Sequence, residues 1–413
     1  MLWKIAWRNV WRHGKRTALT IVTMTFGLGL FIWMDSMLKG MDRVGLENII
    51  NLTDSSLKIT TRQYEEEGGY SLDYGIDRLQ EVESALKEDP RVLAVTTRTR
   101  ALGQLSNGRY ATPVLITVID PEKDRRVYTL GEYVEGSWFP QDVAAPIIVG
   151  KALATELGVG LGDWITLAGR TRWEAHNARD FQIVGLLHAP EPSLNKGTVF
   201  IPFSVGEDFL ELEGLRTEIS VRMEKRTNLA WAMADSDELA RKIEERFPEL
   251  RAKSFGEVGR AFLELSKAKS KGASIIILVV LLIGGLGIAN TILMSVFSRI
   301  KEIGVLRAFG LNPRQIRRLF MIEGAIIGLV GSASGLLFGL LLDLQLIVYG
   351  FPLDAMMGNI DMGLPLSGNL YGEWNPDAFV VALSLGFLLA IMASWGPAKR
   401  ASKMEVTDAL RFV

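Results

Sequence analysis

The sequence has no cysteine among its 413 residues, which excludes disulfide scaffolds, thiolate metal sites and cysteine nucleophiles. It has only three histidines, His13, His176 and His188, which are too scattered to suggest a metal site or a catalytic triad. It also has no surplus of either charge, with 46 basic and 47 acidic residues, so we expect no nucleic-acid partner. No G-x-x-x-x-G-K-[ST] motif is present, and the chain is therefore not expected to bind ATP through a P-loop.

Long apolar stretches dominate the rest of the sequence. Crossing a bilayer takes about 20 helical residues, and four stretches approach or exceed that length. They run from Thr17 to Met34, Ala273 to Ser298, Leu319 to Leu342 and Ala378 to Ala398, with Glu323 as the one charged residue inside them. We interpret all four as membrane spans. A cleaved signal peptide is the alternative for the first, but no small-residue cleavage site follows it.

Basic residues predict the orientation of these spans. They gather before the first span, between the second and third, and after the fourth, whereas 350–376 holds Asp354, Asp361 and Glu373 without a base. Both termini are therefore expected in the cytoplasm. The predicted organisation is a cytoplasmic interfacial helix (1–16), a first transmembrane helix (17–40), a periplasmic α/β domain (41–270), a second transmembrane helix (271–298), a cytoplasmic loop (299–318), a third transmembrane helix (319–349), a short outer loop (350–376), a fourth transmembrane helix (377–398) and a cytoplasmic tail (399–413).

The segment 41–270 has the pattern of a mixed α/β domain. Asn107-Gly108 between two β-branched runs predicts a hairpin. Helices are predicted over 77–87 and 236–247, the second with Ser236 as its N-cap. Short strands are predicted at Leu57–Thr61, Val92–Thr99, Val114–Ile119, Phe181–Leu186, Thr198–Ile201 and Glu218–Arg222.

The first sixteen residues predict an amphipathic helix. One side carries Leu2, Trp3, Ala6, Trp7, Val10 and Trp11, and the other carries Lys4, Arg8, Arg12 and Lys15. Tryptophans at the acyl boundary and bases facing anionic headgroups are typical of a helix that lies in the membrane interface. We therefore expect membrane lipids to contact this helix.

The spans contain features that predict packing rather than chemistry. Glu323 lies about one turn from Arg317 and Arg318, and we favour a structural ion pair there over a proton relay. Asp35 and Asp343 lie at the outer span ends and need no special explanation. Small residues four apart let a neighbouring helix approach closely, as expected at Gly324, Gly328, Gly331, Gly335 and Gly339.

The loop between the second and third spans mixes charged and apolar residues in a short helix. Gly310 is expected to end this helix, and Asn312-Pro313 is expected to begin the next one. Docking of a partner and burial among lipid headgroups are equally good interpretations of the residue pattern alone. The candidate docking residues are Lys301, Glu302, Ile303, Gly304, Val305, Leu306, Arg307, Ala308, Phe309 and Gly310.

At this loop the sequence resembles a known family. Glu302–Gly310, preceded by Gly287–Leu293, is similar to the coupling-helix region of FtsX-like ABC permeases, which include the MacB efflux pumps and the lipoprotein-releasing (Lol) permeases. Pro397–Ser402 and Asp408–Arg411 resemble the family's closing motif. Ile119–Glu122, Ile148–Ala154, Gly162–Leu167 and Phe181–Gly185 resemble its periplasmic core, so the resemblance covers nearly the whole chain.

The resemblance implies a four-helix permease with a MacB-like periplasmic domain, located in the bacterial inner membrane. Its implied partners are two cytoplasmic ATPase subunits, which would bind ATP and Mg, and a second permease subunit in a homo- or heterodimer. Glu302, Ile303, Leu306 and Arg307 would lie in the ATPase groove. The chain itself would be a transport subunit rather than an enzyme.

Two purposes fit the resemblance. We prefer extraction of lipoproteins towards a periplasmic carrier, and the alternative is MacB-like efflux of peptides or small amphiphiles with a periplasmic adaptor. A receptor or scaffold without transport is a third class. The stretch 168–180 has the length of a protruding hairpin that contacts such a partner, or of an ordinary solvated one, and its candidate residues are Arg170, Arg172, Trp173 and Arg179.

The predicted orientation can be tested by labelling, since the chain has no cysteine of its own. A single cysteine at position 307 is expected to react with a membrane-impermeant maleimide only after the cytoplasmic side is opened. Reaction at position 307 in intact cells would overturn the orientation.

Overall fold

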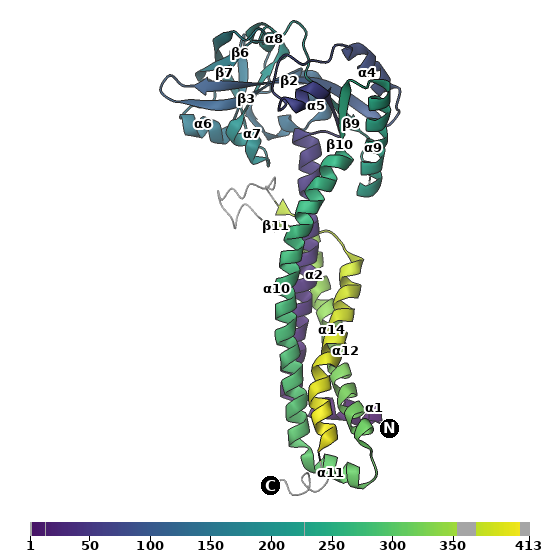
Figure 1. The fold of residues 1–413 in the computed structure, drawn as a ribbon. Coiled ribbons are helices and arrows are strands. Elements are labelled where there is room, and N and C mark those ends of the chain that lie inside the picture. Colours follow the sequence, from purple (N-terminus) through teal and green to yellow (C-terminus); the bar gives the residue numbers. More distant parts are fainter. Residues whose placement is uncertain (1, 13, 227, 353–368, 405–413) are drawn as a thin grey trace. The chain divides into compact units, whose positions relative to one another are not determined.

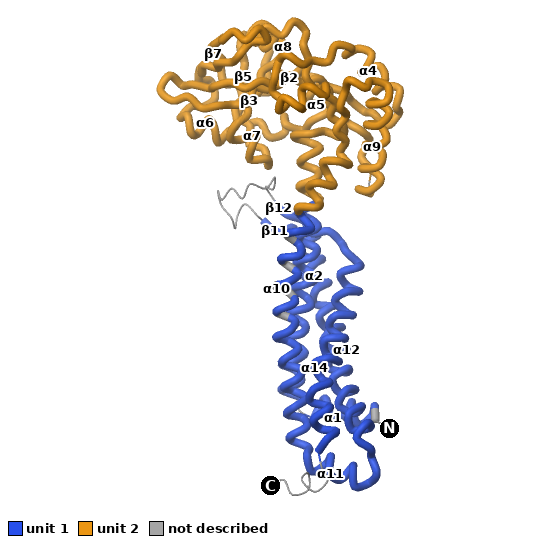
Figure 2. Tube along the Cα trace, viewed as in Figure 1, with its two compact units in different colours: residues 1–42, 266–353, 369–413 blue, residues 43–265, 354–368 orange. Residues whose placement is uncertain are grey.

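The computed structural model describes residues 2–12, 14–226, 228–352 and 369–404. The chain divides into two compact units (Figure 2), here named the helical unit and the α/β unit. The described parts of 1–42, 266–353 and 369–413 form the helical unit, and 43–265 form the α/β unit. Asp354 and Asp361 of the predicted outer loop, and Asp408–Arg411 of the predicted tail, lie outside the described residues.

Among the described residues of the helical unit, four helices are long and apolar enough to cross a membrane, as predicted. They lie alongside one another in Figure 1, and two of them, α2 and α10, have residues in both units. The four are α2 (Gly14–Asn48), α10 (Phe255–Ser298), α12 (Pro313–Tyr349) and α14 (Pro376–Lys403). The shorter elements are α1 (Leu2–Arg12), α11 (Ile300–Ala308), β11 (Phe351–Pro352) and β12 (Asn369–Leu370), the last two paired antiparallel.

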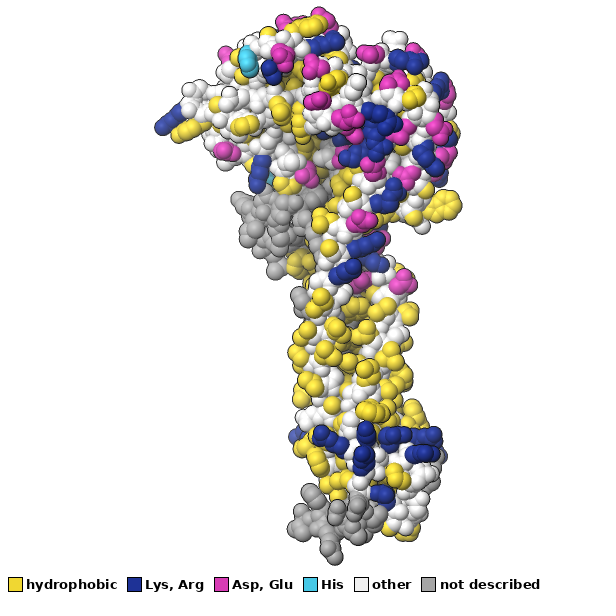
Figure 3. Space-filling model, in the orientation of Figure 1, with side chains coloured by type: hydrophobic (Ala, Val, Ile, Leu, Met, Phe, Trp, Pro, Cys, Tyr) yellow, Lys and Arg dark blue, Asp and Glu magenta, His cyan; other side chains and the backbone are white. Residues whose placement is uncertain are grey.

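The surface of the helical unit is apolar, unlike that of a water-soluble bundle. Leu19, Leu286 and Met392 are each at least 70% exposed. Figure 3 shows apolar side chains over the middle of the spans, and Lys and Arg side chains gathered towards the end that holds α11. Because exposed apolar area of this extent is unfavourable in water, the pattern indicates a belt that faces lipid.

The α/β unit is built on a mixed sheet. Its strands are β1 (Leu57–Thr61), β2 (Val92–Ser106), β3 (Ala111–Ile119), β4 (Val134–Gly136), β5 (Pro146–Gly150), β6 (Trp164–Arg170), β7 (His176–Leu187), β8 (Thr198–Pro202), β9 (Glu218–Met223) and β10 (Leu250–Ser254). Its helices and helical turns are η1 (Ile49–Thr53), α3 (Arg62–Glu66), α4 (Leu79–Lys87), α5 (Pro121–Val127), η2 (Leu130–Tyr133), α6 (Lys151–Leu157), α7 (Pro192–Gly197), α8 (Phe203–Phe209) and α9 (Leu229–Arg246).

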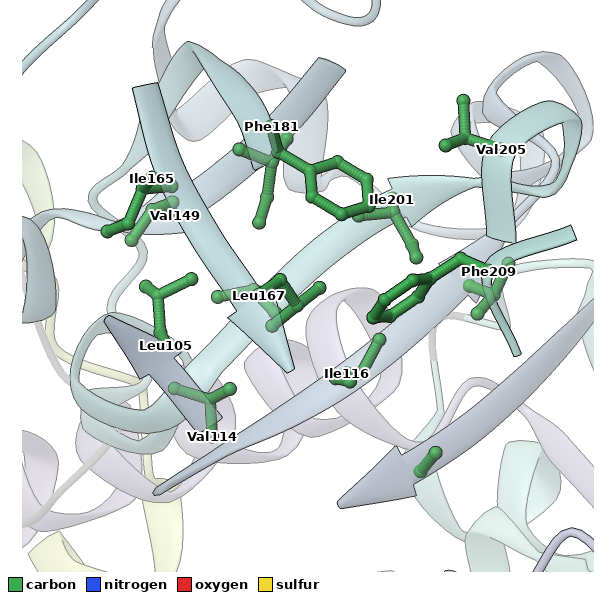
Figure 4. Packing of buried hydrophobic residues seen from close by; sticks show 14 of the residues in the cluster. Leu105, Val114, Ile116, Val149, Ile165, Leu167, Phe181, Ile201, Val205 and Phe209 are labelled. Carbon is green, nitrogen blue, oxygen red and sulfur yellow. The ribbon is translucent and has the colours of Figure 1, made fainter. Parts of the chain in front are cut away.

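The strand order in the sheet is β10-β1-β9-β2-β3-β8-β5-β7-β4, and β6 pairs with β2 and β7. The pairs β3–β8 and β5–β7 are parallel, and the other pairs are antiparallel. Apolar side chains of these strands form a core that also includes residues of α6 and α8. Figure 4 shows Phe181 and Phe209 within it, and their rings pack edge to face with centroids 5.4 Å apart.

Local turn chemistry explains where the first hairpin forms. Asn107 Oδ1 accepts hydrogen bonds from the backbone N–H groups of Arg109 (2.9 Å) and Tyr110 (2.7 Å). Gly108 has a φ of +82°, a conformation that side chains with a Cβ rarely adopt. The predicted hairpin at Asn107-Gly108 is therefore confirmed, between β2 and β3.

One predicted helix start is wrong. Helix α9 begins at Leu229, and its N-cap is Asn228, whose side chain accepts hydrogen bonds from the N–H groups of Ala230 and Trp231. Ser236 lies inside the helix, where its buried hydroxyl donates to Met233 O (2.9 Å) and accepts from Gly256 N (3.1 Å). The predicted 1–16 helix is also too long, since α1 ends at Arg12 and α2 begins at Gly14.

A buried charged cluster links β2 to α5 and β9. The Arg98 guanidinium donates to both Asp124 carboxylate oxygens (2.8 and 2.9 Å) and lies 3.4 Å from the centroid of the Tyr128 ring. Tyr128 donates to Ser220 Oγ on β9 (2.8 Å), and Arg98 and Asp124 are at most 2% exposed. A buried pair like this is balanced only while both partners are present.

We expect Arg98→Met to lower the free energy of unfolding of the α/β unit by about 3–5 kcal/mol, because Asp124 is left buried and unpaired. The double variant Arg98→Met with Asp124→Leu should lose less. Hydrogen exchange of peptides from β2 and α5, measured in the full chain at increasing urea concentration, gives the free energy of unfolding of the single and of the double variant. A double variant less stable than the single one would contradict this account.

Candidate coupling site of the helical unit

Helix α11 is a nine-residue helix bounded by two turn signals. At its end Gly310, with a φ of +97°, donates its N–H to Arg307 O (3.0 Å). Asn312 then caps α12: its side chain accepts from Gln315 N, and the Gln315 side chain accepts from Asn312 N, both at 2.9 Å. With Pro313 in the first turn, this cap confirms the predicted end of one helix and start of the next.

The two faces of α11 have different surroundings. Ile300, Ile303 and Gly304 are buried against the helical unit, and Ile303 is only 2% exposed. Val305 is 44% and Phe309 83% exposed. Ile303 is predicted to contact a partner, and in this structure its side chain packs within the core of the helical unit.

The remaining candidate residues of this loop divide between the two faces. Leu306 and Arg307 are half-buried, and the Arg307 guanidinium donates to the carbonyl oxygen of Met404, just after α14. Lys301, Glu302 and Ala308 are exposed. Glu302 is bound by Arg12 and Arg299, and the other exposed residues, Lys301, Val305, Ala308 and Phe309, are here named the outer face of α11.

Glu302 and Glu323 are linked by Arg299, which lies just before the predicted docking residues. Arg299 Nε donates to Glu302 Oε2 (2.8 Å), and its Nη1 donates to Glu323 Oε1 (3.0 Å). Both Arg299 and Glu323 are at most 6% exposed. The ion pair predicted for Glu323 is present, but its partner is Arg299 rather than the exposed Arg317 and Arg318.

Helix α1 completes this network. Arg12 Nη1 donates to Glu302 Oε1 (2.7 Å), and Asn9 Nδ2 donates to Glu323 Oε1 (2.7 Å). Four elements therefore meet through two carboxylates: α1, the end of α10, α11 and α12. We call Asn9, Arg12, Arg299, Glu302 and Glu323 the charge network.

The charge network keeps Glu302 ionised. The hydrogen bond from Arg299 lowers the pKa of this carboxyl below its usual range, and Arg12 acts in the same direction. A lowered pKa means that the two interactions are complete at neutral pH and are lost as the pH falls through that value. The pKa shift therefore favours the ionised form of Glu302, which is the form that both arginines bind.

The position of α1 differs in one respect from the predicted helix. Ala6 and Val10 are buried and belong to the same apolar core as α12, so they do not face lipid. Trp3, Trp7 and Trp11 are 46–55% exposed. Lys4, Arg8 and Arg12 are exposed as well, which leaves an aromatic and basic surface suited to headgroups.

The glycines of α12 lie at two close helix contacts. A Cβ added at Gly328 would lie 2.3 Å from Ala390 Cβ on α14, and one at Gly324 would collide with Ser394. Further along α12, Gly331, Gly335 and Gly339 lie against Met24, Leu28 and Ile32 of α2. Helix α12 thus packs closely on two different spans in succession.

The candidate partner hairpin in the α/β unit consists of β6, β7 and the turn 171–175. Its turn is held by the loop near Leu212, because Arg172 N donates to Leu210 O (3.0 Å) and its Nη1 lies 3.8 Å from Glu213 Oε2. Arg170 pairs with Glu174, and Arg179 is exposed on β7. Trp173 is 62% exposed, so this large aromatic ring is available to a partner.

Known proteins resemble the chain over most of its length. It is 26% identical over 306 aligned positions to an uncharacterised ABC transporter permease, MJ1507, of Methanocaldococcus jannaschii, covering 70% of this chain and 69% of that one. It is 21% identical to the lipoprotein-releasing system transmembrane protein LolE of Haemophilus influenzae over 98% of both chains. It is 25% identical to the macrolide export ATP-binding/permease protein MacB of Bartonella henselae, covering 96% of this chain and 57% of that one.

Two family descriptions match successive parts of the sequence. Residues 17–246 match the MacB-like periplasmic core domain, and residues 274–406 match the C-terminal part of the FtsX-like permeases. The second match contains α11, α12, α14 and residues 274–298 of α10. The chain therefore belongs to the FtsX-like ABC transporter permeases that carry a MacB-like periplasmic core domain.

Proposed function

We propose that this ABC transporter permease subunit extracts lipoproteins from the inner membrane and passes them to a periplasmic carrier. The similarity to LolE over 98% of both chains supports this choice of cargo. Force transmission is supported by the two sides of α11. Val305 and Phe309 are exposed on its outer face, and the charge network binds the helix to the spans.

In this proposal an ATPase subunit binds the outer face. Burial of Val305 and Phe309 supplies affinity, and Lys301 at the edge contributes orientation. Movement of α11 is then transmitted through Arg299, which is bonded both to Glu302 on α11 and to Glu323 on α12 and which follows α10 directly. A buried ion pair resists separation, because either partner left alone in the core is costly.

The proposed assembly has two ATPase subunits, which hold ATP and Mg, and two permease subunits, identical or paralogous. The α/β domain is proposed to be inserted between the first and second spans on the periplasmic side, with both termini in the cytoplasm. Helices α2 and α10, which have residues in both units, are the proposed route by which motion reaches it.

Efflux with a periplasmic adaptor is the second candidate function. Its support is the similarity to MacB of Bartonella henselae over 96% of this chain. Both candidates use the same coupling site and differ in what enters between the spans.

The coupling site predicts two separable defects. Phe309→Asp should weaken binding of the ATPase by about 2 kcal/mol, or roughly thirty-fold, because an exposed aromatic anchor becomes a charge. Glu302→Gln should leave the complex intact but reduce substrate-stimulated ATP turnover, since Arg12 and Arg299 lose their shared carboxylate. Co-purification from membranes measures the first effect, and ATP turnover of the purified complex measures the second.

Tyr349→Asp is the matched control for Phe309→Asp. Tyr349 is 76% exposed and lies at the far end of α12 from α11, so this variant should bind the ATPase normally. Normal co-purification and normal stimulation in Phe309→Asp would remove the outer face of α11 as the docking site.

The cargo can be tested by depletion. Loss of the chain is expected to leave acylated lipoproteins in the inner membrane, as measured by membrane fractionation and immunoblotting. Normal lipoprotein sorting with increased sensitivity to amphiphilic compounds would instead favour efflux.

A further inference from the structure

A second acid is buried in the helical unit, and its surroundings contrast with those of Glu323. Asp343 on α12 is fully buried, and neither carboxylate oxygen accepts a hydrogen bond from the residues that the structure describes. Ser36 on α2 lies beside it and is 2% exposed, but its hydroxyl does not meet hydrogen-bond geometry with the carboxylate. Glu323, by comparison, accepts from Asn9 and Arg299.

The packing of α12 on α2 brings these two side chains together. Gly339 lies against Ile32, and Asp343 and Ser36 each follow one helical turn later. A Cβ added at Gly372 would lie 2.5 Å from Ser36 Oγ and 2.9 Å from Leu346 Cδ2. Gly372 therefore packs directly against Ser36 of α2 and Leu346 of α12.

Backbone hydrogen bonds hold that cover in place. Gly372 N donates to Leu346 O on α12 (3.4 Å), and Glu373 N donates to Ser36 O on α2 (3.2 Å). The short segment before α14, residues 370–375, is thus hydrogen-bonded to both α12 and α2.

The charge of the neighbouring Asp35 is unfavourable for a carboxylate at position 343. Asp35, on the preceding position of α2, is close enough for its charge to act on Asp343, and it accepts from Asn375 Nδ2. Glu373 of the covering segment is also acidic, and Lys39 on α2 is exposed. Among the described residues, no lysine, arginine or histidine forms an ion pair with Asp343.

A neutral carboxyl group resolves this arrangement. An unpaired carboxylate buried away from water is strongly unfavourable, and a neighbouring negative charge makes it more so. Protonation removes the charge and provides an O–H group that can donate a hydrogen bond to Ser36 Oγ.

We propose that Asp343 is a proton-binding site at the outer end of the spans, and that its ionisation loosens the contact of α12 with α2 and with the 370–375 segment. The proton exchanges with the aqueous phase on that side. The packing of the permease thereby becomes sensitive to external pH, whichever cargo it carries.

Dicyclohexylcarbodiimide, an apolar reagent that modifies protonated carboxyl groups, tests this proposal on the full chain in lipid nanodiscs. We expect peptide mass spectrometry to find modification at Asp343 near neutral pH. Modification should fall about ten-fold for each pH unit above the point at which the group ionises. Glu323 is the internal control and should stay unmodified, since its carboxylate oxygens already accept hydrogen bonds from Asn9, Ser295 and Arg299.

Two results would overturn the proposal. Absence of modification at Asp343 at every pH from about 5 to about 9 would show that it is not a protonated, exchangeable group. Protection by Na⁺ at constant pH would show that the site binds a small cation instead of a proton.

Asp343→Asn tests the structural consequence, because the amide resembles the neutral acid in shape. The natural chain is expected to lose thermal stability as the pH rises. Its folded form keeps a proton on Asp343 in a pH range where the unfolded form has already lost it, so a higher pH favours unfolding. Asp343→Asn should lack this part of the pH dependence, whereas Asp35→Asn should retain it at a lower pH, because a negative neighbour has been removed. Equal pH dependence in the natural chain and Asp343→Asn would contradict the proposal.

Discussion

The buried pair between Arg299 and Glu323 is the constraint on which the helical unit depends. It lies where α10 ends, α11 begins and α12 passes, and it fixes the position of three elements with one guanidinium group. Neither partner can leave without exposing the other to an apolar core, which gives the junction its rigidity. Asn9 and Ser295 also donate hydrogen bonds to Glu323, so several donors stabilise its carboxylate.

Helix α12 is the element that combines the other constraints. Its glycines lie against α14 on one stretch and against α2 on the next. Of its two acids, Glu323 comes before these glycines along the helix and Asp343 comes after them. Close backbone approach through glycine leaves little freedom for independent movement of single spans. A force applied to α11 is therefore expected to move α12 as a body, and this agrees with the proposed role of a transmitter.

The two buried carboxyl groups of α12 illustrate how surroundings decide the role of a residue. Glu323 has cationic and neutral donors and acts as a fixed link. Asp343 has an acidic neighbour and a hydroxyl group, and is proposed to carry a proton. The α/β unit contains a third arrangement, in which Arg98 and Asp124 neutralise each other completely within the core.

Much of this organisation is determined by the sequence alone, because hydropathy and turn chemistry act locally. The four apolar helices, the hairpin at Asn107-Gly108 and the cap at Asn312 follow from side chains a few residues apart. Strands such as β10, which has one large apolar residue and two basic residues, were missed because their stability comes from partners such as β1. Tertiary structure alone decided that Arg299 pairs with Glu323, that Ile303 faces inward and that Asp343 lacks a donor. These outcomes depend on which helices meet and at what rotation, and that is set by the packing of distant side chains rather than by neighbours along the chain.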